Sequence, residues 1–72
     1  MTREQYGQAF ENGGFSRTVE ILRKRGANPD LAHEAAQAAW AHGWERRDQL
    51  RDRNRVVEWV ISIAIRFGAC EK

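Results

Sequence analysis

Apolar residues recur at helical spacing along the whole chain. Tyr6 and Phe10 lie four residues apart, and Phe15, Val19 and Leu22 repeat at the three-to-four-residue spacing of one helix face. No run alternates between apolar and polar residues in the way of a half-buried strand. The pattern predicts an all-α fold, a small bundle of three to four helices over residues 3–11, 15–25, 29–50 and 54–67.

Glycine and proline mark the expected ends of these helices. The run Asn12-Gly13-Gly14 separates the first two helices, and the segment from Gly26 to Asp30 reads as a turn. Asn28 is a good N-cap, and Pro29 is favoured at the first helical position. Gly68 follows the last apolar run and suits a helix C-terminus.

The third helix is rich in alanine and tryptophan. Its expected packing face holds small residues that allow a close approach of another helix: Leu31, Ala35, Ala38 or Ala39, and Ala41 or His42. Trp40 and Trp59 are expected in the core because large aromatic residues at helical spacing are usually buried. Trp44 follows Gly43, and for this residue core and exposed positions stay open.

The last helix is apolar on two opposite sides, and a helix that is apolar all round should be buried all round. In so small a domain, this predicts a central helix, a dimer contact or a surface left bare by a missing segment. One side holds Val56, Trp59, Val60, Ile63 and Phe67, and the opposite side holds Val57, Ile61, Ala64 and Ile65.

Length and composition indicate a single small domain over residues 1–72. The chain is 42% hydrophobic and 31% charged, as in ordinary globular proteins. Cys70 has no second cysteine to pair with, the N-terminus lacks an apolar signal core, and the apolar run 56–67 is too short to span a bilayer. We therefore expect a cytoplasmic protein without a membrane partner.

Catalytic and metal motifs are incomplete. The run from His33 to Gln37 resembles a zinc-protease helix, but Gln37 stands where the second histidine ligand belongs, and His42 is nine residues from His33. Neither Ser16, Ser62 nor Cys70 has a local triad arrangement. No glycine-rich phosphate loop with its lysine is present. The sequence predicts no enzyme, no metal and no cofactor.

Arginine is concentrated between the third and fourth helices. The formal net charge is only +2, although the chain holds 12 basic residues. Composition favours a solvated helix end with acid–base pairs such as Asp48 with Arg51 and Asp52 with Arg55. The alternative is a basic strip that contacts the phosphates of an opened DNA strand, with Trp59 available for stacking. The arginines of this stretch are Arg46, Arg47, Arg51, Arg53 and Arg55.

An ordered series of residues carries a family resemblance. In the third helix, Pro29, the run from Ala32 to Glu34, Gln37, Trp40 and Trp44 follow the order D-P-x-x-A-E-D-L-V-Q-E-x-F-x-x-x-W. The run 45–51 is similar to W-x-x-x-D-x-F-R, and the run 59–64 matches W-L-x-x-I-A. The set covers most of the chain and resembles region 2 of sigma-70 family RNA polymerase sigma factors, particularly the extracytoplasmic-function type.

The resemblance implies a role in transcription initiation or its regulation. Its expected partners are RNA polymerase core, through the clamp helices of the β′ subunit, single-stranded DNA of the −10 promoter element, and an anti-sigma regulator. By position in the motif, the polymerase-binding residues are Glu34, Gln37 and Arg47. The DNA-binding residues are Arg51, Arg53, Asn54, Arg55 and Trp59. Glu34, Gln37 and Ala41 share one helix face, while Ala36, Trp40 and Gly43 turn elsewhere.

Two departures from the family pattern limit the expectation. Ile65 and Arg66 stand where the family has Arg and Asn, so duplex contact by the last helix is not expected. The 72 residues also hold no second helix-turn-helix domain of the kind that reads the −35 element, which fits an excised domain or a stand-alone relative. The alternative function is a helical protein-interaction module that forms a homodimer through Val57, Ile61 and Ile65.

Overall fold

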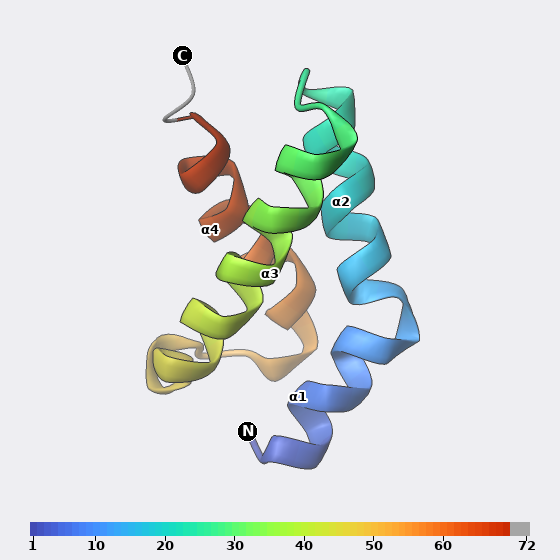
Figure 1. The fold of residues 1–72 in the computed structure, drawn as a ribbon. Helices are drawn as coiled ribbons and strands as arrows, with labels where there is room; N and C mark the ends of the chain where they lie inside the picture. Colours follow the sequence, from blue (N-terminus) through green and yellow to red (C-terminus); the bar gives the residue numbers. More distant parts are fainter. Residues whose placement is uncertain (70–72) are drawn as a thin grey trace.

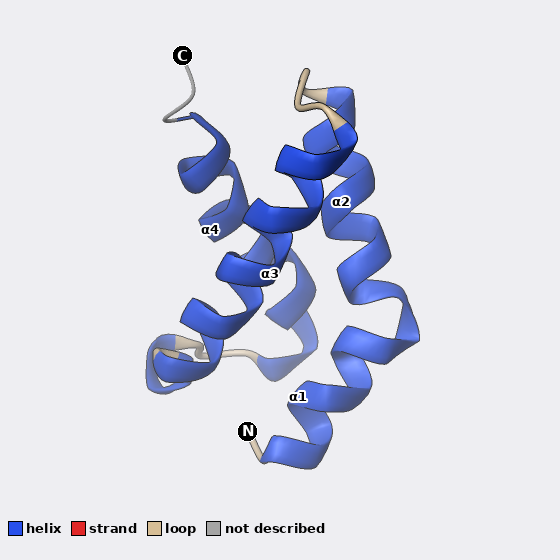
Figure 2. Ribbon diagram, in the orientation of Figure 1, coloured by secondary structure: helices blue, strands red, loops and turns tan. Residues whose placement is uncertain are grey.

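Four α-helices and short connecting turns make up the chain. The computed structural model describes residues 1–69, with side chains to residue 67, so Cys70 lies outside the described residues. Within these residues no strand occurs, and the all-α prediction is confirmed (Figure 2). The α-helices are α1 (Arg3–Ala9), α2 (Phe15–Lys24), α3 (Pro29–Glu45) and α4 (Val56–Ala69).

Helix α3 is the centre of the bundle. It packs against both α2 and α4. Helices α1 and α2 follow one another along one side of the molecule, with a bend between them (Figure 1). The turn between α2 and α3 and the longer connection between α3 and α4 lie at opposite ends of the molecule (Figure 1). None of the described helices is long and apolar enough to cross a membrane.

Helices α1 and α2 are joined by a kinked turn rather than by a loop. A π-helical turn, Phe10–Gly14, connects them, and its non-helical backbone angles fall at Asn12 and Gly13. Gly13 has a φ of 100°, a value that glycine adopts without steric cost. The predicted break at this point is therefore a bend in a nearly continuous helix. The start of α1 is fixed by a capping box between Thr2 and Gln5.

The start of α3 follows the sequence rules, but its end does not. Asn28 caps the helix by accepting a 2.8 Å hydrogen bond from the Leu31 amide, and Pro29 is the first residue, as predicted. The helix ends at Glu45, not at residue 50. The chain then turns through two short 3₁₀ helices, Arg47–Gln49 and Arg53–Arg55. This turn places Leu50 against the core.

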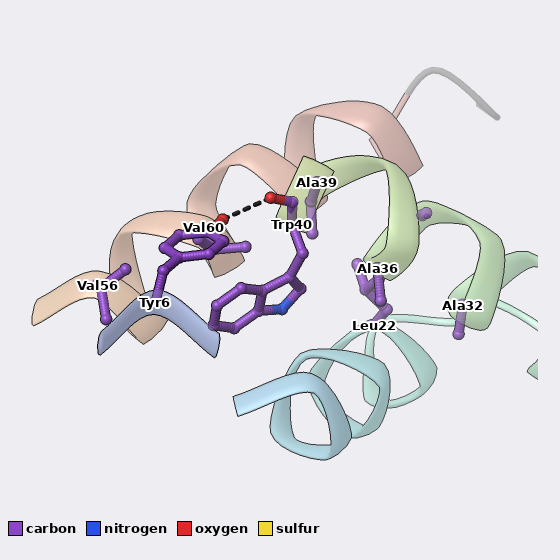
Figure 3. Packing of buried hydrophobic residues seen from close by; sticks show 10 residues of the cluster. Tyr6, Leu22, Ala32, Ala36, Ala39, Trp40, Val56 and Val60 are labelled. Carbon is purple, nitrogen blue, oxygen red and sulfur yellow. Dashed lines mark hydrogen bonds between the residues drawn. The ribbon is translucent and has the colours of Figure 1, made fainter. Parts of the chain in front are cut away.

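The core is built around the small residues of α3. Ala32, Ala36 and Ala39 have no exposed surface, which lets the neighbouring helices approach closely. Of the residues expected on the packing face, Ala35 and Ala39 are buried and Leu31 and His42 are half-buried, whereas the alternatives Ala38 and Ala41 are exposed. The buried hydrophobic cluster consists of Tyr6, Leu22, Ala32, Ala35, Ala36, Ala39, Trp40, Val56, Val60 and Ala64 (Figure 3).

Gly43 shows how closely the helices approach. A Cβ atom at this position would lie 2.7 Å from the Tyr6 hydroxyl oxygen and 3.2 Å from a methyl group of Val60. Helices α1 and α4 therefore meet α3 at a point where only glycine fits without adjustment.

A buried hydrogen-bond chain ties three helical segments together. The Tyr6 hydroxyl donates to the Trp40 carbonyl oxygen (Figure 3). The Trp40 Nε1 donates over 3.1 Å to Thr18 Oγ1, which itself donates over 2.7 Å to the Gly14 carbonyl oxygen. Burial raises the pKa of the Tyr6 phenol well above its usual value, so this donor keeps its proton. Among the described residues, every buried side-chain nitrogen and oxygen atom has a hydrogen-bond partner, as a buried network requires.

Aromatic side chains form a continuous row along the same seam. Tyr6 contacts Trp44 and Trp40, with ring centroids 5.3 and 5.2 Å apart. From Trp40 the row continues over Phe10, Phe15 and His33 at centroid distances of 5.5, 4.9 and 5.0 Å. Trp40 is thus a core residue as predicted, while Trp44 and Trp59 are half-buried at the edge of the core.

The second apolar side of α4 is largely covered inside the monomer. Ile61 is only 7% exposed, and Val57 and Ile65 are half-buried against the core. Of the three alternatives that the sequence left open for this helix, packing inside the monomer accounts for most of this side. The helix is apolar all round because α1, α2 and α3 all contact it.

Candidate functional site

The connection between α3 and α4 is rich in arginine. We name residues 46–55 the arginine segment; it holds five arginines and two aspartates, a net charge of +3. All its side chains are exposed except those of Arg47 and Leu50, which are half-buried. Two local bonds shape its second half: the Asp52 carboxylate accepts from the Asn54 amide over 3.0 Å, and the Arg55 amide donates to the Asp52 carbonyl oxygen over 2.9 Å.

The acid–base pairs expected within this segment are not formed. No ion pair joins Asp48 to Arg51 or Asp52 to Arg55 among the described residues. Arg55 Nε instead lies 3.3 Å from Glu58 Oε1 on α4. The prediction of these two ion pairs was wrong. Helix α3 ends before these residues, so their side chains do not have the spacing that an α-helix would give them. Arg51 and Arg53 are thereby left available to an external anion.

A hollow beside the arginine segment collects three of the predicted DNA-binding residues. Arg51, Arg55 and Trp59 all line a space of about 420 Å³. Leu50 and the half-buried Trp59 supply apolar surface, and charged side chains surround it. The complete lining consists of Gln49, Leu50, Arg51, Asp52, Arg55, Glu58 and Trp59.

The two remaining predicted DNA-binding residues lie elsewhere. Arg53 and Asn54 line a separate hollow of about 290 Å³ against the N-terminal residues Met1 and Gln5. The predicted set is therefore divided between two hollows, because the 3₁₀ turn of Arg53–Arg55 sends successive side chains in different directions.

Arg47 has a role that the sequence did not reveal. Its guanidinium carbon lies 3.8 Å from the centre of the Trp44 ring, and its Nη1 donates over 2.7 Å to the Trp44 carbonyl oxygen. The side chain thus satisfies a carbonyl group in the last turn of α3 and stacks on an aromatic face. This half-buried arrangement ties Arg47 to its own helix end and sets it apart from the exposed residues Glu34 and Gln37.

The exposed side of α3 forms a second candidate surface. Glu34, Gln37 and Ala41 are exposed while Ala36, Trp40 and Gly43 are buried, which confirms the predicted division of the two faces. The exposed side carries carboxylates and small residues but no basic side chain. We name it the acidic face and define it as Asp30, Glu34, Gln37, Ala38, Ala41 and Glu45.

Potential metal ligands lie apart from one another in residues 1–69. Within the described residues, no three His, Cys, Asp or Glu side chains lie close enough together to hold a metal ion. The phenol with the raised pKa, Tyr6, is engaged with the Trp40 carbonyl oxygen in the core. The arginine segment and the acidic face are the two surfaces considered below.

Comparison with known proteins gives no match: no family model, no curated protein and no solved structure is similar to this chain.

Proposed function

We propose that this chain is a sigma region-2-like domain that binds RNA polymerase core and single-stranded promoter DNA. The observation that carries the proposal is the hollow in which Arg51 and Arg55 flank the half-buried ring of Trp59. This observation adds to the sequence resemblance, which rests only on the order of residues along the chain.

The chemistry of the hollow suits an unpaired nucleotide. An exposed aromatic face stacks on any base and contributes about 1–3 kcal/mol per base, while arginine side chains attract the phosphates on either side. Leu50 adds apolar surface, and the carboxylates of Asp52 and Glu58 can accept hydrogen bonds from exocyclic amino groups of a base. A paired base offers no free π-face, so the hollow favours single strands.

The acidic face suits the second partner. Ala38 and Ala41 are small and exposed, which allows another helix to approach α3 closely. The carboxylates of Asp30, Glu34 and Glu45 favour a partner with basic side chains, and Gln37 supplies a neutral donor and acceptor. The clamp helices of the polymerase β′ subunit are the partner we propose here. Self-association through Val57, Ile61 and Ile65 has less support, since Ile61 is buried in the monomer.

The test of the DNA role is a titration with a labelled A/T-rich single-stranded oligonucleotide followed by fluorescence anisotropy. Arg51→Glu should weaken binding about tenfold, the equivalent of about 1.4 kcal/mol, while leaving the helical circular dichroism unchanged. Arg25→Glu is the matched control because Arg25 is exposed and directly follows α2, and the turn after α2 lies at the opposite end of the molecule from the arginine segment (Figure 1). If both variants lost the same oligonucleotide affinity, the binding would depend on net charge alone and the proposed site would be wrong.

A further inference from the structure

A second hollow lies between α2 and the start of α3, away from the arginine segment. It encloses about 620 Å³ and has apolar walls formed by Phe15, Val19, Ala27 and Pro29. Phe15, Val19 and Ala27 are half-buried. The monomer therefore covers only one side of these residues, and the other side faces the hollow.

Contacts within the monomer fix the residues that form the walls of this hollow. The Phe15 ring is fixed between Phe10 and His33, with centroid distances of 4.9 and 5.0 Å. Ala27 follows the C-terminal turn of α2, where its amide donates over 3.1 Å to the Leu22 carbonyl oxygen. A preformed wall of this kind lowers the conformational cost of docking an apolar side chain.

Basic side chains outnumber acidic ones at the rim of the hollow. Arg23 and Lys24 stand at the rim, and the one acidic side chain there, Glu20, lies 3.9 Å from Lys24 in an exposed pair. No ion pair or hydrogen bond engages the Arg23 side chain within the described residues. Neither Asp30 nor Glu34 of α3 lines the hollow, although Asp30 lies one helical turn from His33, which does. The rim therefore presents an uncompensated positive charge.

We propose that this hollow docks an acidic amphipathic helix of a partner protein. An apolar anchor, such as a leucine or phenylalanine side chain, enters between Phe15, Val19 and Ala27, and carboxylates on the flanking turns meet Arg23 and Lys24. Helix-in-groove recognition combines these two elements, an apolar anchor and a complementary rim. The inference is separate from the proposed function because it uses neither the arginine segment nor the acidic face.

The test is an NMR titration of the ¹⁵N-labelled domain with a capped peptide of about 15 residues, a length at which helix formation begins. The peptide carries leucines on one helical face and glutamates on the other. The expected result is saturable binding with the largest shifts at the amides of Val19, Phe15 and Ala27. Arg23→Glu should weaken this binding about fivefold, as expected when an exposed charge pair becomes a repulsion.

Two controls decide the outcome. The same peptide with lysine in place of each glutamate should bind more weakly, and Arg17→Glu should have little effect because Arg17 lies on the same helix but lines a different hollow. The proposal is overturned if the acidic peptide does not bind, if both peptides bind equally, or if Arg17→Glu weakens binding as much as Arg23→Glu. Larger shifts of the same amides with the A/T-rich oligonucleotide would also overturn it in favour of a nucleic-acid site.

Discussion

The acidic face and the arginine segment adjoin each other at the end of α3, yet they are built in opposite ways. The acidic face is one side of a continuous helix whose other side is fully packed through Ala36 and Trp40. The arginine segment consists of two 3₁₀ turns with exposed side chains and few internal bonds. A surface supported from beneath suits recognition by shape. A charged segment on a short irregular connection suits attraction of a partner that adapts to it.

The largest expected effect comes from disturbing the packing of the Trp40 ring of α3 against Gly14. Gly14→Ala should lower the free energy of unfolding by about 3 kcal/mol, because overpacking forces the backbone to move. The added Cβ would lie 2.4 Å from the Ala9 carbonyl oxygen and 2.8 Å from the Trp40 ring. Urea denaturation measures the change. Gly7→Ala is the control: nothing lies within 4 Å of its Cβ, so stability should rise by about 0.5–1 kcal/mol. Equal stability of the two variants would contradict the packing described.

The next effect concerns the buried hydrogen-bond chain. Thr18→Val leaves the Trp40 Nε1 without an acceptor and should cost about 2 kcal/mol of unfolding free energy. Trp40→Phe removes the donor itself, so adding Thr18→Val to it should cost less than the same change in the natural chain. Urea denaturation of the four proteins completes a double-mutant cycle. Strict additivity would mean that the hydrogen bond contributes nothing.

The two surfaces should also be separable by binding. Gln37→Ala should weaken the complex with an isolated β′ clamp-helix fragment by about fivefold to tenfold, as for a central interface residue, and leave oligonucleotide affinity unchanged. Arg51→Glu should produce the reverse pattern. Tryptophan fluorescence follows the first titration and anisotropy the second. If one substitution weakens both complexes, the two surfaces form a single site and the comparison drawn above is wrong.

The smallest effect lies where the two surfaces meet. Arg47→Ala removes the stacking on Trp44 and the bond to its carbonyl oxygen, at a cost of about 1 kcal/mol in unfolding free energy. Arg46→Ala is the neighbouring control because Arg46 is exposed. Thermal unfolding by circular dichroism resolves the difference. An unchanged melting temperature for Arg47→Ala would contradict the stabilising role of these two contacts.

Much of the fold follows from local sequence rules. Asn28 and Pro29 begin α3 where capping preferences place them, and the exposed positions of Glu34 and Gln37 follow from helical periodicity. These features depend on residues within one or two turns of each other. A sequence can therefore predict them without knowledge of tertiary contacts.

Features that depend on distant partners were not predictable in the same way. The end of α3 at Glu45 has no glycine or proline to mark it and coincides with the return of Leu50 to the core. On α3, a run of alanines gives almost no periodic signal, so the sequence left Ala38 or Ala39, and Ala41 or His42, open as members of the packing face. The sequence left the covering of Ile61 open because the contacts that cover α4 come from helices far away in the sequence. Thr18 was not singled out in the sequence, although it stands four residues before Leu22, a spacing that places both residues on one helix face.

The aromatic row gives the domain an optical property of its own. Tyr6 is the one tyrosine of the chain, and two indole rings lie within 5.3 Å of it. Energy absorbed by the phenol passes to these indoles at such short range, so the folded domain emits almost entirely as tryptophan. Detachment of α1 separates the rings, and tyrosine emission then rises. The protein thus carries an intrinsic, label-free indicator of whether its first helix is docked.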